Sequence, residues 1–307
     1  MAVFKKAERR RTYLKIGISG VSGGGKTYSS LLMARGLCNS WEEVGIICTE
    51  NGSANLYAHL GDYNVLELEP PFTPNKYING ILAAEEAGIK CLVIDSATHA
   101  WAGQGGLLEQ HSKATASKHK GNSYTAWREI TPKHNELVDA MLQSKVHLIT
   151  TMRSKQQHVV NTENGKTTVT KLGLAPVQRD GMEYEFTIMF DISSDHVVNA
   201  SKDRTGLFDG QYFTPSIETG KTMLEWLNSG AEMKENKGTE GLREKINKQK
   251  ETEDIIDYLK SEYKSCSDKK IQVDFRKKMK ADGIKKFDEA TVEQLRELKE
   301  YWNELTQ

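Results

Sequence analysis

The stretch GVSGGGKT at residues 20–27 constrains the fold more than any other part of the chain. It lies between the apolar run LKIGIS at 14–19 and a helix-like segment at 26–38. Glycine destabilises the interior of helices and strands, so glycines gathered at such a junction indicate a connection of unusual backbone shape. A strand, a glycine-rich turn and a helix in this order are typical of an α/β domain with a mainly parallel sheet.

The spacing within this stretch follows the pattern G-x-x-x-x-G-K-[ST], which is typical of phosphate-binding loops. Glycines let the backbone wrap so that successive N–H groups point at phosphate oxygens, and the following helix adds the positive end of its dipole. We expect Lys26 to reach the β- and γ-phosphates and the Thr27 hydroxyl to bind Mg²⁺. The residues expected to contact the nucleotide here are Gly20, Ser22, Gly23, Gly24, Gly25, Lys26, Thr27 and Tyr28.

Short apolar runs alternate with helical patterns over roughly the first 230 residues, which predicts an α/β domain at 1–230. The expected strands are 14–19, 44–49, 64–69, 90–96, 145–152, 185–193 and 196–202. The expected helices are 26–38, 75–88 and 127–144. Two intervening stretches show no clear period, so we expect long loops at 101–123 and 153–183.

The composition changes after residue 230, where the chain becomes rich in Lys and Glu and contains no Pro. Apolar residues recur at helical spacing, which predicts a small helical C-terminal domain at 231–307 behind a polar linker. The cations of SDKKIQVDFRKKMKADGIKK are expected on a solvated helical face. Contact with nucleic acid and docking of a partner, for example a single-strand binding protein, remain alternatives.

Charge and composition limit the classes of function. The formal net charge is +0, so a surface for nucleic acid has to be a local patch. The four cysteines include no CxxC pair, which argues against a zinc or redox motif. No run is apolar and long enough to span a bilayer, and the N-terminus does not resemble a signal peptide. We therefore expect a cytoplasmic protein with no membrane partner.

Two further strands end in acidic residues. KCLVIDS carries Asp95 at its carboxyl end, where open α/β sheets bind their ligands, and Asp95 is expected to help hold Mg²⁺. VGIICTE ends at Glu50, whose carboxylate is placed to polarise an attacking water. The alternative for Glu50 is a turn residue before Asn51 and Gly52.

The order of GVSGGGKT, ICTE, VIDS and SKDRTG resembles the RecA-type ATPase core. Over roughly residues 10–228 the chain is most similar to compact phage-encoded RecA-like ATPases that support single-strand annealing and recombination. The resemblance implies a RecA-like P-loop NTPase core, with Glu50 as the catalytic glutamate and Tyr57 stacked on adenine. Ala54 replaces an Asp of that family, and Thr150-Thr151 replaces Asn-Gln, which leaves Thr151 as the expected nucleotide sensor.

The resemblance also implies a DNA-binding loop and a pair of cations that act on a neighbouring subunit. The loop after residue 152 is expected to contact DNA phosphates through its cations, which are Arg153, Lys155, Lys166, Lys171 and Arg179. Lys202 and Arg204 match a basic pair that reaches the neighbour's γ-phosphate and acts in catalysis together with Lys26. The alternatives are a solvated surface excursion for the loop and a charged hairpin for the pair.

These features together predict an ATP- and Mg²⁺-dependent protein that binds single-stranded DNA and promotes annealing or exchange. It would act as a homo-oligomer, a filament or a ring, in the cytoplasm of a bacterial host. Two other classes remain open, a nucleotide-gated interaction protein with slow hydrolysis and a kinase-like phosphotransferase. A kinase is disfavoured because it would need arginines in its lid, and the candidate lids hold mostly Lys.

Overall fold

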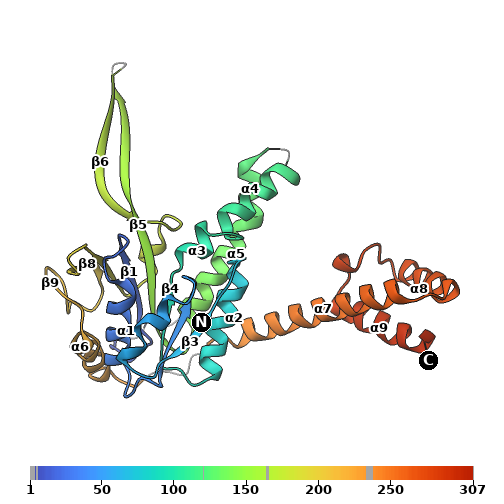
Figure 1. The fold of residues 1–307 in the computed structure, drawn as a ribbon, viewed down its shortest axis with the longest axis horizontal. Helices are drawn as coiled ribbons and strands as arrows, with labels where there is room; N and C mark the ends of the chain where they lie inside the picture. Colours follow the sequence, from blue (N-terminus) through green and yellow to red (C-terminus); the bar gives the residue numbers. More distant parts are fainter. Residues whose placement is uncertain (1–3, 5, 120, 164–165, 233–237, 307) are drawn as a thin grey trace. The chain divides into compact units, whose positions relative to one another are not determined.

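The computed structural model describes residues 4, 6–119, 121–163, 166–232 and 238–306, with the backbone alone within 156–173. The chain divides into two compact units, with the division between Thr239 and Glu240. The larger unit holds a central sheet with helices on both faces (Figure 1). The smaller unit is helical.

The described residues of the larger unit form one sheet of nine strands in the order β3-β2-β4-β5-β1-β7-β8-β9, with β6 paired to β5. The six strands from β3 to β7 in this order run parallel to their neighbours, whereas β6, β8 and β9 are antiparallel. The predicted α/β class with a mainly parallel sheet is confirmed. The strands are β1 Lys15–Gly20, β2 Val44–Cys48, β3 Asn64–Glu67, β4 Cys91–Asp95, β5 His147–Glu163, β6 Lys166–Pro176, β7 Ile188–Ile192, β8 Val198–Asp203 and β9 Tyr212–Phe213.

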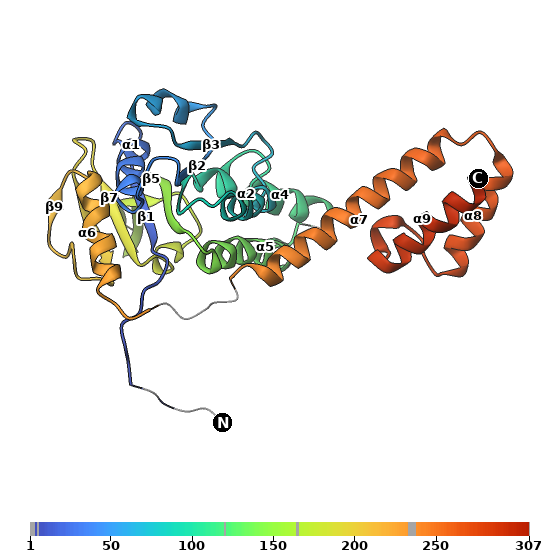
Figure 2. The ribbon, with the colours of Figure 1, turned by 90° about the horizontal axis from the view of Figure 1, so that it is seen from below.

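Helices cover both faces because the central strands are apolar on both sides. Ile46 packs in a core with Leu31 of α1, whereas its neighbour Ile47 points to the other face, toward Gly80 of α2. Helix α1 lies beside α6, and α2 lies beside α5 (Figures 1 and 2). The helices are α1 Lys26–Gly36, α2 Pro74–Glu86, α3 Thr98–Ala102, α4 Leu107–Ser117, α5 Ser123–Gln143 and α6 Ile217–Asn228, with 3₁₀ turns η1 Ser53–Leu60 and η2 Met182–Tyr184.

Two glycines set the close packing of α1 on α6. A Cβ at Gly36 would lie 2.1 Å from the Ile217 carbonyl oxygen, and one at Gly220 would lie 2.2 Å from the Met33 carbonyl oxygen. No side chain fits at either distance. This close approach fixes α1, and therefore the glycine-rich turn before it, against the sheet.

The expected loop at 101–123 is wrong, because α4 occupies about half of it. Only Leu107 and Ala114 of α4 are buried, so the helix carries too few apolar residues to show a period. An aromatic contact joins α4 to α5 instead, since the His111 ring stacks on Trp127 of α5 at a centroid distance of 4.0 Å. A stack between separate helices leaves no periodic signal in either one.

The expected loop at 153–183 is also wrong over most of its length. Strand β5 continues to Glu163 and pairs with the antiparallel strand β6. Glu163 pairs with Lys166 at one end and Ser154 pairs with Pro176 at the other, and the two strands form an arm that projects from the sheet (Figure 1). The runs HVV and TTVT supply the β-branched residues that favour extended backbone. The Asn-Gly pair at 164–165 lies outside the described residues.

The smaller unit buries its own core. Its elements are α7 Glu240–Ser265, α8 Lys269–Ala281, the 3₁₀ turn η3 Phe287–Glu289 and α9 Val292–Thr306. Phe275 and Trp302 are buried and meet edge to face at 4.9 Å, with Leu259, Leu295 and Leu298 around them. The Asp268 carboxylate caps α8 by accepting a hydrogen bond of 2.7 Å from the Lys270 amide.

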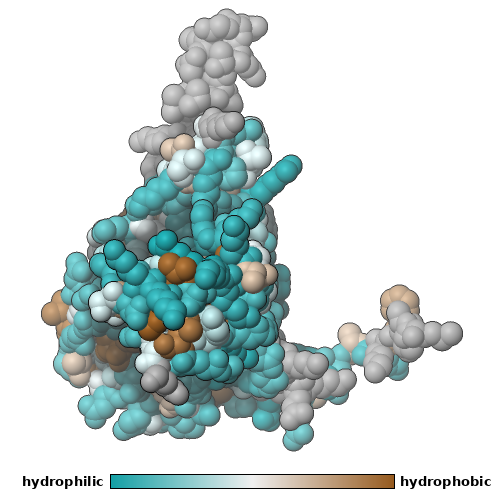
Figure 3. Space-filling view, turned by 90° about the vertical axis from the view of Figure 1, so that its right-hand side faces the viewer, coloured by the Kyte–Doolittle hydropathy of each residue, from teal (hydrophilic) through white to brown (hydrophobic). Residues whose placement is uncertain are grey.

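Among the described residues, no helix has the length and apolar character required to cross a membrane. The face of the molecule in Figure 3 is mostly hydrophilic, with hydrophobic side chains only in small patches.

Candidate functional site

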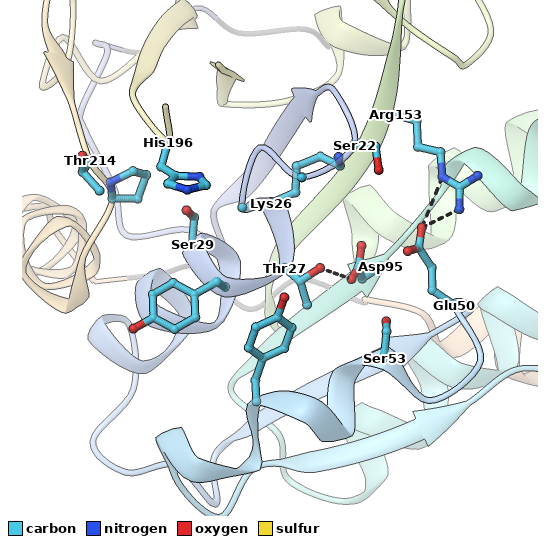
Figure 4. Close-up of a pocket in the computed structure, with 15 residues that line it drawn as sticks. Ser22, Lys26, Thr27, Ser29, Glu50, Ser53, Asp95, Arg153, His196 and Thr214 are labelled. Carbon is cyan, nitrogen blue, oxygen red and sulfur yellow. Dashed lines mark hydrogen bonds and ion pairs between the residues drawn. The ribbon is translucent and has the colours of Figure 1, made fainter. Parts of the chain in front are cut away.

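A cavity of about 680 Å³ lies at the carboxyl ends of β1, β2 and β4, beside Arg153 within β5. This is the edge at which open α/β sheets bind ligands. Figure 4 shows side chains converging on it from the glycine-rich turn, α1, η1 and β5. Its lining includes Ser22, Gly23, Gly25, Lys26, Thr27, Tyr28, Glu50, Tyr57, Asp95 and Arg153, all predicted site residues.

The glycine-rich turn has the backbone that its sequence requires. Gly23 and Gly25 have φ values of 79° and 85°, in the left-handed region that favours glycine. Lys26 opens α1, and its Nζ donates to the carbonyl oxygens of Gly20 at 3.1 Å and Val21 at 2.8 Å. Burial lowers the pKa of Lys26, and the nearby Asp95 opposes that shift. The turn therefore holds a cation at the start of a helix, as phosphate binding requires.

Asp95 is held between two hydroxyl groups. Thr27 Oγ1 donates to Asp95 Oδ2 at 2.6 Å, and Thr151 Oγ1 donates to Asp95 Oδ1 at 2.5 Å. Burial raises the pKa of Asp95, and the two hydrogen bonds act in the opposite direction. Thr151 is itself fully buried and does not line the cavity, so the structure places this expected nucleotide sensor behind the carboxylate.

Glu50 and Arg153 form an ion pair across the cavity edge. Arg153 donates to Glu50 Oε1 from Nη2 at 2.8 Å and from Nε at 3.2 Å (Figure 4). Glu50 follows β2, and Arg153 lies on β5 opposite Gly20 of β1. Arg153 was expected in the DNA-binding set, but the structure places its side chain in the cavity.

Two tyrosines contribute aromatic rings to the lining of the cavity. The rings of Tyr28 on α1 and Tyr57 on η1 are tilted to one another with centroids 5.9 Å apart. Both line the cavity and are suited to contact a planar base. Ala54, where the resemblance expects an acid, is fully buried.

A protein-family model described as an AAA domain matches residues 12–230. The chain belongs to this family. The match contains all the cavity residues above, and it indicates a P-loop ATPase. A search of curated proteins found no match.

The residues of the AAA domain fit a magnesium–nucleotide complex. The Thr27 hydroxyl and the Asp95 carboxylate are hard oxygen ligands, which Mg²⁺ prefers. No cluster of three His, Cys, Asp or Glu suited to a metal occurs in the part of the chain that the structure describes, so phosphate oxygens and water would complete the shell. The cavity volume lies in the range of small-ligand sites. When bound, the nucleotide would supply the phosphoryl group and these side chains would hold and orient it.

Sequence reasoning missed one contact of the glycine-rich turn. His196, in the connection between β7 and β8, lines the cavity and places its Nδ1 3.1 Å from the Gly24 carbonyl oxygen. Its φ of 67° is unusual for a residue other than glycine. No motif surrounds this histidine, so only the sheet order, which sets β7 beside β1, brings it to the turn.

Lys202 and Arg204 lie outside the cavity of their own chain. Lys202 on β8 donates to the carbonyl oxygens of Glu183 at 3.3 Å and of Tyr184, and Arg204 Nη2 donates to Tyr184 at 3.1 Å. Partial burial lowers the pKa of Lys202, and the charge of Arg204 adds to the shift. The structure thus brings the two cations together at one carbonyl, away from Lys26.

Three of the four remaining residues of the expected DNA-binding set lie on the β5–β6 arm, and Arg179 lies apart from it. Lys155 is exposed on β5 just beyond the cavity. Arg179 lies beside α5, in a shallow pocket that includes His134 and Asp139. Lys166 and Lys171 belong to β6 by their backbone, and their side chains lie outside the described part.

Proposed function

We propose that this AAA-domain protein is a RecA-like, oligomeric ATPase that binds single-stranded DNA and promotes strand annealing or exchange. The observation that carries the proposal is the course of β5. This strand bears Arg153 in the cavity and continues without a break into the arm formed with β6 (Figure 1). Because one strand belongs to both the cavity and the arm, a change at Arg153 can reach the arm along β5.

The arm is suited to contact a phosphate backbone. Lys155 is exposed two positions beyond Arg153, and Lys166 and Lys171 follow on the paired strand. Cations on an extended arm hold nucleic acid through its phosphates and carry no sequence preference. Binding of this kind suits a protein that handles strands of any sequence.

Lys26, Thr27 and Asp95 would hold the nucleotide and its Mg²⁺, and Glu50 would orient the attacking water. Lys202 and Arg204 would complete the site of a neighbouring copy in a filament or a ring. Their place outside their own cavity supports this role, because a cation that acts in trans has to face outward. From the resemblance to phage-encoded ATPases we further propose that the protein acts on single-stranded DNA, together with a single-strand binding protein, in the cytoplasm of a bacterial host.

A second candidate is a nucleotide-gated interaction protein with slow hydrolysis. The ion pair between Glu50 and Arg153 favours it, because a carboxylate engaged by a guanidinium is a poor base for water. The two candidates differ in whether ATP hydrolysis is needed to release the assembly from DNA. Glu50→Gln traps DNA-bound assemblies in the first and leaves assembly unchanged in the second.

The test is ATP hydrolysis with and without single-stranded DNA, compared between Lys155→Glu and the matched control Lys90→Glu. Lys90 is also exposed, but it precedes β4 and therefore lies at the opposite edge of the sheet. We expect DNA to raise the rate of the wild-type protein and of Lys90→Glu, and to raise that of Lys155→Glu severalfold less. Equal stimulation of both variants contradicts a role of the arm, and no stimulation of the wild type contradicts the DNA-dependent function.

A further inference from the structure

We propose that a groove on the C-terminal unit binds a short acidic peptide carrying one large apolar side chain. The groove has a volume of about 290 Å³ and lies between the end of α7, α8 and the segment that follows α8. We call it the basic groove. Its apolar floor consists of Met279, Ile284 and Phe287, and its cations are Arg276, Lys280 and Lys285.

The three cations of the basic groove are not neutralised by acidic side chains. In the described part of the chain, Arg276, Lys280 and Lys285 have no acidic group at ion-pair distance, and no acidic side chain lines the groove. Three other lysines of the same stretch are each paired, namely Lys277 with Asp274 at 3.0 Å, Lys278 with Asp282 at 3.0 Å and Lys286 with Glu289 at 4.0 Å. Lys269 and Lys270 of the same stretch also have no ion-pair partner in the described part of the chain, but they do not line the groove. The groove itself therefore presents three cations without acidic partners, which fits a negatively charged ligand.

The apolar floor of the groove requires a ligand with an apolar side chain. Ile284 is buried, and Met279 and Phe287 are half-buried. Tyr263, which also lines the groove, has a buried hydroxyl without a hydrogen-bond partner among the described residues. This hydroxyl is closed to solvent, so the apolar floor and the cations are the groups that a ligand would contact. The volume accommodates one large side chain, which would act as the anchor of the peptide.

The aromatic rings at the groove favour a peptide over a nucleic acid. The Tyr263 ring packs against Phe275 and Trp302 at centroid distances of 6.0 Å each, and the Arg276 guanidinium lies 5.4 Å from its centroid. The Phe287 ring packs against Phe275 at 6.4 Å. Single-stranded nucleic acid binds by stacking its bases on exposed ring faces. These rings are engaged in the core, so the groove offers an apolar floor with a charged rim.

The test measures fluorescence anisotropy of a labelled peptide of several aspartates ending in phenylalanine, titrated with the full chain. We expect saturable binding that weakens as salt rises. Replacing the phenylalanine with alanine should weaken binding at least about tenfold, because the anchor is lost. A labelled oligothymidine is measured in parallel, with no nucleotide added, so the result does not depend on the ATPase.

Charge reversal then locates the site. Lys280→Glu should weaken peptide binding about tenfold, whereas Lys277→Glu, the same change on a paired lysine outside the groove, should leave it within about twofold. Lys285→Glu serves as a second variant, and circular dichroism confirms that each variant is folded. Equal losses in Lys277→Glu and Lys280→Glu overturn the proposal, as does indifference to the phenylalanine. Absence of peptide binding overturns it too, and oligothymidine binding that depends on Lys280 would then assign the groove to nucleic acid.

Discussion

The cavity edge of the sheet and the region around β8 hold their charged groups in opposite ways. At the cavity, Asp95 is fixed by two hydroxyls and Glu50 by Arg153, all from the same chain. Around β8, Lys202 and Arg204 share the carbonyl oxygen of Tyr184. At the cavity, charged and hydroxyl groups of the chain bind one another. Around β8, the hydrogen bonds that the structure gives to Lys202 and Arg204 go to backbone carbonyl oxygens, and Lys202 also lies over the Tyr184 ring.

This difference bears on our proposal that Lys202 and Arg204 act on a neighbouring copy of the chain. Groups fixed before the ligand arrives lose little freedom on binding, which makes the cavity a ready phosphate site. A cation bonded to a carbonyl can exchange that neutral partner for an anion at small cost, since charged hydrogen bonds are the stronger ones. Four substitutions test the roles assigned to these two regions.

Lys26→Ala removes the cation of the cavity and should have the largest effect. We expect nucleotide affinity to fall at least about 100-fold and hydrolysis to be lost, because the phosphates lose their closest charge. Titration with a fluorescent ATP analogue measures the affinity. Lys90→Ala is the control, since Lys90 lies at the opposite edge of the sheet. Unchanged affinity of Lys26→Ala would exclude the glycine-rich turn as the phosphate site.

Arg204→Ala should leave nucleotide affinity within about twofold and lower hydrolysis by about 10³, the scale of an arginine that stabilises phosphoryl transfer. Mixing Arg204→Ala with Lys26→Ala protein gives a sharper result. Interfaces that combine the intact Lys26 of one copy with the intact Arg204 of another should restore part of the rate. Normal hydrolysis by Arg204→Ala alone, or no recovery in the mixture, speaks against a shared site.

Glu50→Gln keeps the shape of the side chain but removes its charge and basicity. We expect hydrolysis to fall by about 10², because a general base contributes on this scale, while nucleotide still binds. Single-turnover measurement of phosphate release separates the two quantities. Asp62→Asn, a change at an acid outside the cavity lining, is the control. A normal rate in Glu50→Gln would leave Glu50 as a structural partner of Arg153.

Thr151→Val should have the smallest effect on nucleotide affinity, and its pH dependence reports on the protonation of Asp95. Burial already raises the pKa of Asp95, and the Thr151 hydroxyl favours the ionised form. If Asp95 holds Mg²⁺ in its ionised form, as we propose, affinity for magnesium nucleotide should fall on acidification at a pH above the usual range of an aspartate. Loss of the hydroxyl should move this fall to higher pH and weaken binding a fewfold at fixed acidic pH. Affinity titrations over a pH series measure both, and identical pH curves for the two proteins would contradict the role of Thr151.

Some features could be predicted from local sequence because one short stretch contains their whole cause. The left-handed glycines at 23 and 25 follow from the phosphate-loop pattern, and Asp95 follows from an apolar strand that ends in an acid. The arm and α4 could not be predicted in this way. Helix α4 buries only Leu107 and Ala114, so the hydrophobic period that identifies most helices is absent, and β6 forms as a strand by pairing with a distant part of β5.

The α/β class, the strand-to-helix turn at 20–27 and the acids at two strand ends follow from the sequence alone, since each depends on neighbours along the chain. Which of the site's side chains contact one another depends on the tertiary structure. The order of β4, β5 and β1 places Thr151 against Asp95, and the register of β5 with β1 sets Arg153 at the cavity where it meets Glu50. Parallel strands gather their carboxyl ends at one edge, but which ends become neighbours depends on strand order. That order is a property of the packed sheet, because it is decided by crossover connections and buried faces far apart in the chain.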